Sequence, residues 1–192
     1  MTPIDPLGCA VFLLLAFTLA GMAQTAWFAT SLSRVFTVPL DGGARLRGRR
    51  LFGENKTLRG FVVMVPAAAL AFVLLGALAG GSRSASLWPL PLPSYALLGA
   101  WAGFGFMAGE LPNSMLKRQL DIEPGGVPNR QLAVILHFVL DRLDSGLGML
   151  AALAIAVDVH WQTWVYVLTF GPFIHWSFSL VMFRLGLKRR AA

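Results

Sequence analysis

The chain has 192 residues, of which 56% are hydrophobic and 13% charged, and its net charge is +7. Soluble domains carry about 25% charged residues, so this composition excludes an ordinary soluble domain and predicts an integral membrane protein. The positive charge does not indicate a nucleic-acid partner, because the cations gather in two loops and the C-terminal tail, as on the cytoplasmic side of membrane proteins. The single cysteine, Cys9, excludes an intrachain disulfide and a cysteine-rich metal site.

Five apolar stretches predict an all-α, polytopic membrane protein, with one domain over residues 1–192. The predicted transmembrane helices cover about residues 7–31, 61–80, 95–109, 132–157 and 161–185. About 20 apolar residues in a helix span the roughly 30 Å of hydrocarbon in a bilayer. The third stretch is shorter, so its helix should carry Glu110 close to the membrane boundary. Alternate prolines, Pro89, Pro91 and Pro93, predict an extended connector before that helix.

The distribution of cations predicts the orientation in the membrane. Loop 33–60 carries seven cations and two acidic residues, and loop 111–131 and the tail are also basic, whereas Arg83 is the main cation on the other side. The positive-inside rule then places the N-terminus outside and the C-terminus in the cytoplasm of a cell membrane. Both loops that we expect to be catalytic would face the cytoplasm, where nucleotides are found.

Asp141 and Asp144 lie three positions apart, one or two turns inside the predicted membrane boundary. On a helix this spacing places them on one face. An ionised side chain inside a bilayer costs roughly 2.5–3.5 kcal/mol, so such residues usually have a function. Two carboxylates at this spacing suit Mg²⁺, which prefers oxygen ligands and retains waters and substrate phosphates. Arg142 projects off that face, where its guanidinium could bind a phosphate bidentately.

Glu110, Ser114 and Lys117 are spaced by four and three residues. They line one face if the helix continues past Pro112, which should distort the backbone there. A carboxylate, a hydroxyl and an ammonium facing the aspartate pair would form a site for a metal-bound triphosphate. The alternative is that these charges pair for structural reasons inside a helical bundle, although a buried ion pair is weak evidence for stability.

The loop after the first predicted helix contains two glycine-rich elements, Asp41-Gly42-Gly43 and the segment 53–60. Glycines let a backbone approach phosphates, and Lys56 and Arg59 can neutralise them. Thr57 is a plausible N-cap for the next helix. The glycine pattern of a Walker A loop is absent. The cations at positions 45, 47, 49 and 50 are better explained by the positive-inside pattern or by contact with anionic lipid than by phosphate binding.

Two of these patterns together resemble a known signature. Ser114-x-x-Lys117-Arg118, a Pro-Gly-Gly turn and Asp141-Arg142-x-Asp144 look like the CTP:phosphatidate cytidylyltransferase superfamily. The Asp41-Gly42-Gly43 element and the segment 52–60 are more similar to its CDP-archaeol synthase branch. The resemblance covers roughly residues 39–148. It implies about five spans and Mg²⁺-dependent transfer of CMP from CTP to a lipid phosphate, with release of pyrophosphate.

On this interpretation, Asp141 and Asp144 are catalytic and, with Glu110, hold one or two Mg²⁺ ions, and Lys117 is the third catalytic residue. The expected nucleotide or phosphate ligands are Lys56, Arg59, Asn55, Thr57, Ser114, Arg118 and Arg142. The expected partners are CTP, a lipid phosphate and membrane lipids. The sequence leaves open the oligomeric state and whether the acceptor is an isoprenoid ether lipid phosphate or phosphatidate. In this chain the Lys-Asp that often follows Lys-Arg is absent, and Pro124-Gly125-Gly126 replaces a histidine-containing turn.

Two other functions compete with this interpretation. Asp41-Gly42-Gly43-Ala44-Arg45 resembles the CDP-alcohol phosphotransferase motif, but its spacing is one residue short and no aspartate follows before Asp121. A small transporter or scaffold could use the buried charges for translocation. A transporter should have polar groups continuing across the membrane, whereas the outer halves of these helices are almost wholly apolar. Both competitors are therefore disfavoured.

Overall fold

The computed structural model describes residues 4–80, 87–123 and 131–186, and for residues 131–138 the backbone alone. Its helices are α1 (Pro6–Ala29), η1 (Leu32–Phe36), α2 (Leu58–Leu78), α3 (Leu92–Gln119), α4 (Gln131–Ala156) and α5 (Trp161–Arg184). Two short strands, β1 (Arg45–Leu46) and β2 (Arg49–Arg50), form an antiparallel hairpin in the loop before α2. The predicted all-α fold is confirmed. The Pro-Gly-Gly turn at residues 124–126 lies outside the described residues.

Three of these helices, α1, α2 and α5, are long and apolar enough to cross a membrane, counting only the residues that the structure describes. The helices α3 and α4 are also long, with 28 and 26 residues, but α3 carries Glu110, Lys117 and Arg118, and α4 carries the aspartates. The number of five spans therefore stays a prediction. The predicted connector ends earlier than expected, because α3 begins at Leu92 with a proline in its first turn, where its missing N–H is tolerated.

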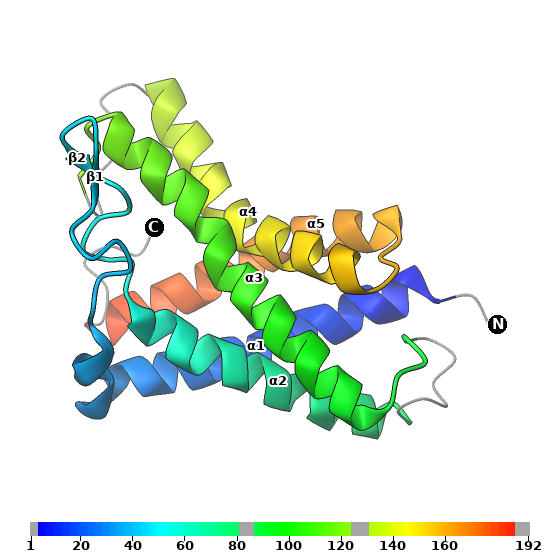
Figure 1. Ribbon diagram of the computed structural model, residues 1–192. Helices are drawn as coiled ribbons and strands as arrows, with labels where there is room; N and C mark the ends of the chain where they lie inside the picture. The colour runs from blue at the N-terminus through cyan, green and yellow to red at the C-terminus, as the bar shows by residue number, and fades with distance from the viewer. Residues whose placement is uncertain (1–3, 81–86, 124–130, 187–192) are drawn as a thin grey trace.

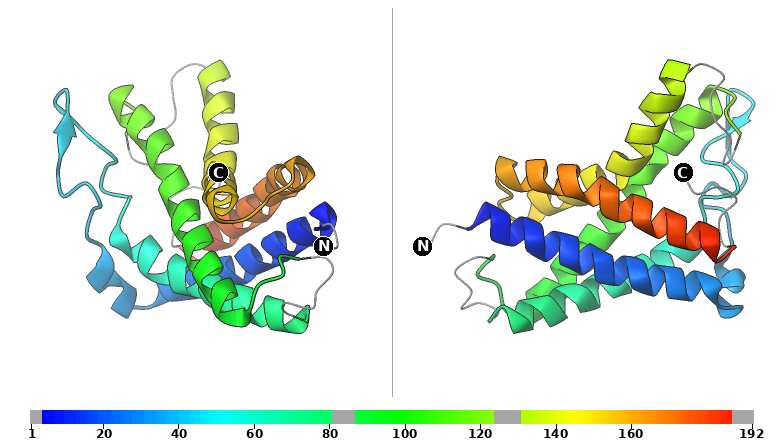
Figure 2. Two further views of the ribbon diagram at one scale, coloured as in Figure 1. Left: turned by 45° about the vertical axis from the view of Figure 1, so that its right-hand side comes forward. Right: turned by 180° about the vertical axis from the view of Figure 1, so that it is seen from behind.

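Figure 1 shows α1, α2 and α5 running side by side, with α3 crossing α2 obliquely and α4 packed against α3. The helix α4 bends partway along its length. The hairpin, the C-terminal end of α3 and the N-terminal end of α4 lie at one end of the bundle, as the rear view in Figure 2 also shows. Of the second loop that we expected to be catalytic, residues 111–119 belong to α3, and the described part of it shares one end of the molecule with the loop before α2.

The contact between α3 and α4 depends on glycines. A Cβ atom added to Gly148 would lie 2.3 Å from the carbonyl oxygen of Gly105 and 2.5 Å from the Cα atom of Gly109. A Cβ atom on Gly109 would lie 2.4 Å from the carbonyl oxygen of Asp144. Small residues let membrane helices approach this closely. Because no side chain separates the backbones here, the polar face of α4 is brought directly against that of α3.

The far end of the bundle holds an aromatic core. Phe12 packs edge-on against Phe72 and Tyr95, with ring centroids 4.9 and 5.8 Å away. The buried Tyr95 hydroxyl donates a hydrogen bond to the carbonyl oxygen of Trp88 at 2.7 Å. The Trp88 indole donates in turn to the carbonyl oxygen of Asp158 at 2.8 Å. These contacts satisfy the polar groups of the aromatic residues. The charged residues of α3 and α4 lie toward the opposite end of the bundle.

Candidate active site

One face of α3 carries four polar residues, Glu110, Asn113, Ser114 and Lys117, at intervals of three, one and three. The helix continues through Pro112, so the shared face expected from the sequence exists. The buried Ser114 hydroxyl donates to the carbonyl oxygen of Glu110 at 2.8 Å. Ser114 therefore supports the backbone next to the proline, and its oxygen can still accept a hydrogen bond.

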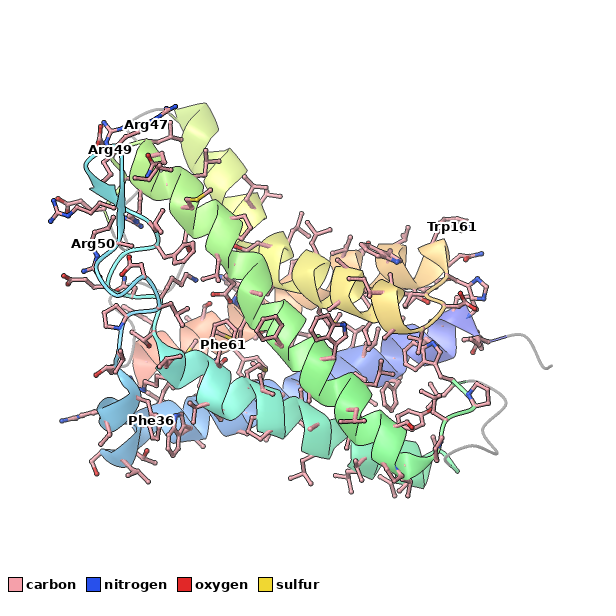
Figure 3. The ribbon with its side chains drawn as sticks, in the orientation of Figure 1. Phe36, Arg47, Arg49, Arg50, Phe61 and Trp161 are labelled. Carbon is pink, nitrogen blue, oxygen red and sulfur yellow. The ribbon has the colours of Figure 1, made fainter. Side chains whose placement is uncertain are left out.

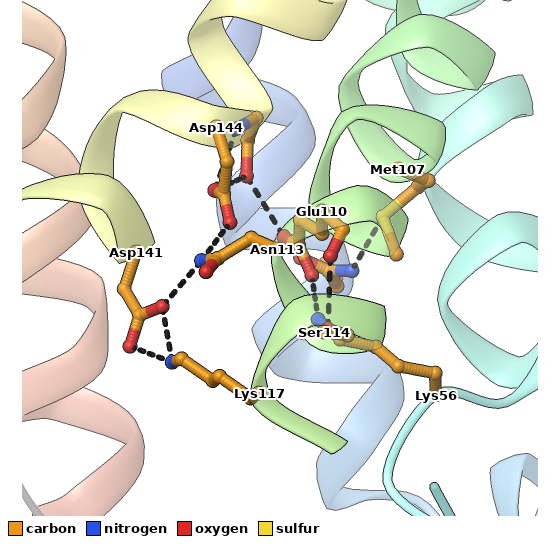
Figure 4. Close-up of polar contacts among 10 residues, drawn as sticks. Lys56, Met107, Glu110, Asn113, Ser114, Lys117, Asp141 and Asp144 are labelled. Atoms are coloured by element: carbon orange, nitrogen blue, oxygen red, sulfur yellow. Dashed lines mark hydrogen bonds and ion pairs between the residues drawn. The ribbon is translucent and has the colours of Figure 1, made fainter. Parts of the chain in front are cut away.

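The two aspartates of α4 meet this face at a single nitrogen atom (Figure 4). The Asn113 amide nitrogen donates to Asp141 Oδ1 at 2.6 Å and to Asp144 Oδ2 at 2.9 Å. Lys117 lies one turn further along α3, and its ammonium group donates to both carboxylate oxygens of Asp141. Lys117 thus faces the aspartate pair across the two helices, as the spacing predicted, and contacts Asp141.

Glu110 occupies the other side of the cluster. Its Oε2 atom accepts from Lys56, which reaches in from the loop before α2, and its Oε1 atom accepts from the Ser145 hydroxyl at 2.8 Å. The Glu110 side chain is 19% exposed, and His175 of α5 lies near enough to interact with its charge. The sequence interpretation had not included Asn113 or His175. A histidine inside an apolar span and an asparagine three residues after Glu110 were the signals that could have found them.

The loop before α2 is built around Asp41, whose side chain is fully buried. Its carboxylate accepts hydrogen bonds from the Arg50 guanidinium at 2.6 Å and from the backbone N–H groups of Gly43, Phe52 and Gly53 at 3.0–3.2 Å. The Arg50 hydrogen bond is the main reason that the pKa of Asp41 lies well below its usual range. Gly43 and Gly53 have φ angles of 86° and 88°, which only glycine adopts readily.

The same loop delivers Lys56 to the site. The backbone N–H of Leu40 donates to the carbonyl oxygen of Lys56 at 2.8 Å, so the two ends of the loop are paired just before α2 begins. Arg49 lies on the hairpin, where Figure 3 labels it. Its guanidinium donates to the carbonyl oxygen of Gln119 and to the Asp121 carboxylate. The hairpin is therefore anchored to the C-terminal end of α3. Arg49 and Arg50 both have structural partners, whereas Arg45 and Arg47 are exposed.

Several predicted phosphate ligands have other partners. Arg59 donates to the carbonyl oxygen of Phe28, and its guanidinium carbon lies 4.3 Å from the centroid of the Phe28 ring. Arg118 donates to the carbonyl oxygen of Ile122. Thr57 stands at the N-cap position of α2 with extended dihedral angles, but its side chain makes no capping hydrogen bond.

Two further predicted ligands lie at the edge of the cluster. Asn55 is exposed. Arg142 is partly buried and interacts electrostatically with Asp141. Among the predicted site residues with described side chains, the structure thus gathers Glu110, Asp141, Asp144, Lys117 and Lys56, and it places Arg59 at the end of α1.

The carboxylates fit a metal ion as a pair. Within the part of the chain that the structure describes, no group of three or more histidine, cysteine, aspartate or glutamate residues has the geometry of a metal site. Glu110 is engaged by Lys56 and lies beside Asp144 through the Ser145 hydroxyl, which contacts both carboxylates, whereas Asp141 and Asp144 converge directly on the Asn113 amide nitrogen. Mg²⁺ is commonly bound by one or two carboxylates, with waters and substrate phosphates completing its shell. The converging pair suits that mode.

A substitution at Asp41 tests the role of the loop. Asp41→Asn should lower the thermal unfolding temperature, because an amide NH₂ would replace an acceptor that now faces hydrogen-bond donors. The depressed pKa implies that the stabilisation by Asp41 is present above about pH 4 and is lost only as the pH falls through the lower folded-state pKa. Melting curves of the purified protein between about pH 5 and 8 should therefore show a constant difference between the wild type and the variant. Glu54→Gln is the control, since the Glu54 side chain is 77% exposed, and an equal effect of both variants would contradict this role.

Polar residues from α3, α4 and the loop before α2 thus converge at one end of a bundle of apolar helices, an arrangement that suits a membrane enzyme acting on phosphates. A family model described as CarS-like CDP-archaeol synthase matches residues 12–191, and the chain belongs to this family. The family transfers a cytidylyl group from CTP to a lipid phosphate. The predicted membrane enzyme is confirmed over the transporter, with CTP and a lipid phosphate as its substrates. Cytidylyltransferases of this type generally use a divalent metal.

Individual relatives agree with the family assignment. The chain is 35% identical over 159 residues to the CDP-archaeol synthase of Halorubrum lacusprofundi, a match that covers 78% of this chain and 81% of that protein. It is 32% identical over 154 residues to the CDP-archaeol synthase of Thermococcus gammatolerans, covering 78% and 80%. A solved structure of an intramembrane enzyme for archaeal membrane lipid biosynthesis superposes with a TM-score of 0.60 at 26% identity, covering 85% of this chain and 90% of that one.

Proposed function

We propose that this enzyme transfers CMP from CTP to an isoprenoid ether lipid phosphate of the archaeol type, with Mg²⁺, and releases pyrophosphate. The observation that carries the site assignment is the convergence of Asp141 and Asp144 on one point of α3, flanked by Lys117. The choice of acceptor is supported by the relatives named CDP-archaeol synthase, which match over most of their length. Phosphatidate is the competing acceptor.

The proposed chemistry requires alignment more than base catalysis. The acceptor phosphate is already ionised, so one of its oxygens can attack the α-phosphorus of CTP directly. The bond between the α-phosphorus and the oxygen that bridges to the β-phosphorus then breaks, and pyrophosphate leaves with the electron pair. The contribution of the chain is to hold the two phosphates in line and to neutralise the charge that builds on the leaving group.

The roles of the residues follow from their positions. Asp141 and Asp144 would hold Mg²⁺, and the bound metal would neutralise phosphate oxygens and the departing pyrophosphate. Lys117 lies next to Asp141 and can turn to a phosphate. Glu110 would act as a third carboxylate once Lys56 moves from it to a phosphate of CTP. Arg118 and Arg142 supply further cations at the edge of the cluster.

The test of this function uses purified protein in lipid nanodiscs with radiolabelled CTP, Mg²⁺ and either of two acceptors, an archaeol-type ether lipid phosphate or phosphatidate. We expect a labelled CDP-lipid and an equal amount of pyrophosphate, with higher kcat/KM for the ether lipid. Faster turnover of phosphatidate would replace the acceptor. Absence of any CDP-lipid from a correctly folded protein would overturn the proposed reaction.

We also propose that the end of the bundle with the hairpin faces the cytoplasm. The support is that the basic loop 37–57 lies at this end (Figure 1) and that its Lys56 contacts Glu110 of the polar cluster. A cysteine at Arg47, on the hairpin, should react with an impermeant thiol reagent only in inside-out vesicles. A cysteine at Asp158, in the connection at the opposite end, should react only in right-side-out vesicles or intact cells. The native Cys9 is buried and provides the background control. Labelling of Arg47→Cys from outside intact cells would reverse the proposed orientation.

Substitutions of Lys56 and Arg59 should have different effects, because only the Lys56 side chain reaches the polar cluster. Lys56→Ala should raise the KM for CTP about tenfold or more, since a charge-assisted hydrogen bond is worth roughly 1.5–3 kcal/mol, with a smaller effect on the KM for the lipid. Arg59→Ala should mainly lower the unfolding temperature, because its guanidinium is held by Phe28. Arg45→Ala removes an exposed cation from the same loop and is the control. A Lys56→Ala defect confined to the lipid dependence would move Lys56 to the acceptor phosphate.

A further inference from the structure

Asn113 lies between the two aspartates of α4. Its amide nitrogen lies between the Asp141 and Asp144 carboxylates and donates a hydrogen bond to each (Figure 4). Two like charges that share a site repel each other, and a donor between them lowers that repulsion in addition to the Lys117 ammonium group, which neutralises Asp141 alone. A cation bound by both carboxylates would have to lie between them, in the region that the Asn113 amide nitrogen now occupies.

The other atom of the amide points to a second role. Asn113 Oδ1 is buried and makes no hydrogen bond within the residues that the structure describes. Buried amide oxygens normally have a partner, so this atom calls for an explanation. A half-turn about the bond between Cβ and Cγ exchanges the amide oxygen and nitrogen. In the turned position the oxygen would face the two carboxylates, an arrangement that is stable only with a cation between them.

We infer that Asn113 is a two-position residue of the metal site: its nitrogen bridges Asp141 and Asp144 before the metal binds, and its oxygen joins them as a ligand afterwards. Amide carbonyl oxygens are suitable ligands for hard divalent cations. The inference rests on the proposed function, because it assumes that the aspartate pair holds the metal. It adds a neutral third ligand to a site whose third carboxylate, Glu110, is engaged by Lys56.

Two substitutions separate the two roles. Asn113→Asp keeps an oxygen ligand of the same shape and loses the N–H donor, whereas Asn113→Ala loses both. Without metal, Asn113→Asp places three carboxylates together, so its unfolding temperature should fall below that of the wild type. With a divalent metal it should recover, because the added charge and the retained oxygen both favour the cation.

The experiment is titration of Mn²⁺ into the purified protein without CTP, followed by the loss of the free Mn²⁺ electron paramagnetic resonance signal and, in parallel, by thermal unfolding. We expect Asn113→Ala to weaken Mn²⁺ binding at least tenfold and Asn113→Asp to bind Mn²⁺ as tightly as the wild type or more tightly. The rise in unfolding temperature on adding Mn²⁺ should be largest for Asn113→Asp. Gln162→Ala, which removes an amide at the opposite end of the bundle, should match the wild type.

The outcomes distinguish this inference from the proposed function. The two-position role would be overturned if Asn113→Ala bound Mn²⁺ with wild-type affinity, or if Asn113→Asp and Asn113→Ala bound it equally weakly. The aspartate site would still stand in either case, provided that Asp144→Asn abolishes Mn²⁺ binding. Wild-type protein that binds no Mn²⁺, or Asp144→Asn that binds it normally, would overturn the aspartate site and the role of Asn113 with it.

Discussion

Replacing Asp141 or Asp144 with asparagine should lower turnover by about a hundredfold or more and leave the fold intact. Metal ions that clamp transferring phosphates contribute several kcal/mol to transition-state stabilisation, and an amide is a much weaker ligand than a carboxylate. The protein should still fold, because the amide oxygen of the new asparagine can accept the hydrogen bond that Asn113 donates to each aspartate. Its unfolding temperature should fall slightly, since the new NH₂ group would face the Ser145 N–H in one variant and Lys117 in the other. The measurement is kcat at saturating CTP and lipid phosphate, together with thermal unfolding and size-exclusion chromatography.

The two variants differ in one useful respect. Asp141→Asn also removes the ion-pair partner of Lys117, whose side chain is 15% exposed, so part of its effect could arise from the unpaired ammonium group. Asp144→Asn removes the acceptor of the Ser145 N–H but leaves the ion pair of Lys117 in place, so it is the cleaner test. Asp158→Asn, at the exposed far end, is the matched control and should turn over like the wild type. Near-wild-type, metal-dependent activity in a folded Asp144→Asn protein would refute the metal-site assignment.

Adding one methyl group at Gly148 should also be severe. In Gly148→Ala the new Cβ atom would lie 2.3 Å from the Gly105 carbonyl oxygen and 2.5 Å from the Gly109 Cα atom, so the backbones of α3 and α4 would have to separate. Overpacking usually costs 1–3 kcal/mol, and a displacement of about 1 Å in an aligned site can lower the rate about a hundredfold. We expect a lower unfolding temperature and a loss of kcat of at least about tenfold, because the two helices carry the two halves of the site.

Gly171→Ala provides the control for this prediction. It is the same substitution inside a helix, but its Cβ atom would meet only Leu14 Cδ2 at 4.0 Å. It should leave both kcat and the unfolding temperature close to those of the wild type. A Gly148→Ala protein that is as stable and active as Gly171→Ala would show that the close approach of α3 and α4 is not needed.

The sequence predicted those parts of the site that depend on spacing along one helix. Asp141 and Asp144 share a face of α4, and Glu110 and Lys117 share a face of α3, because helical periodicity is a local property. Asn113 lies on that same face of α3, but the sequence interpretation relied on charged side chains and therefore did not include this neutral amide. The contact between Asp141 and Lys117 follows from the helix crossing, which depends on glycines far apart in the chain and could not be read from spacing.

The loop before α2 shows where such reasoning stops. Lys56 and Arg59 are both cations in one glycine-bounded segment, and the sequence offered no basis for separating them. The structure directs Lys56 to Glu110 and Arg59 to Phe28, through contacts between residues 54 and 31 positions apart. The Asp41-Gly42-Gly43 element was noticed as a motif, but its role in tying the loop together depends on Arg50 and Gly53, which approach it only in the folded chain.

The double anchoring of the hairpin has an energetic consequence for nucleotide recognition. Asp41 fixes the base of the loop, and Arg49 fastens its tip to the end of α3. Immobilising a flexible, rotamer-rich side chain at the moment of binding costs roughly 0.5–1.5 kcal/mol, and ordering a loop costs more. Here most of that entropy is lost when the protein folds, so ordering of the loop offsets little of the attraction between Lys56 and a triphosphate. Loosening either anchor should therefore make CTP binding more enthalpic and weaker, even though neither Asp41 nor Arg49 contacts the nucleotide in the proposed mechanism.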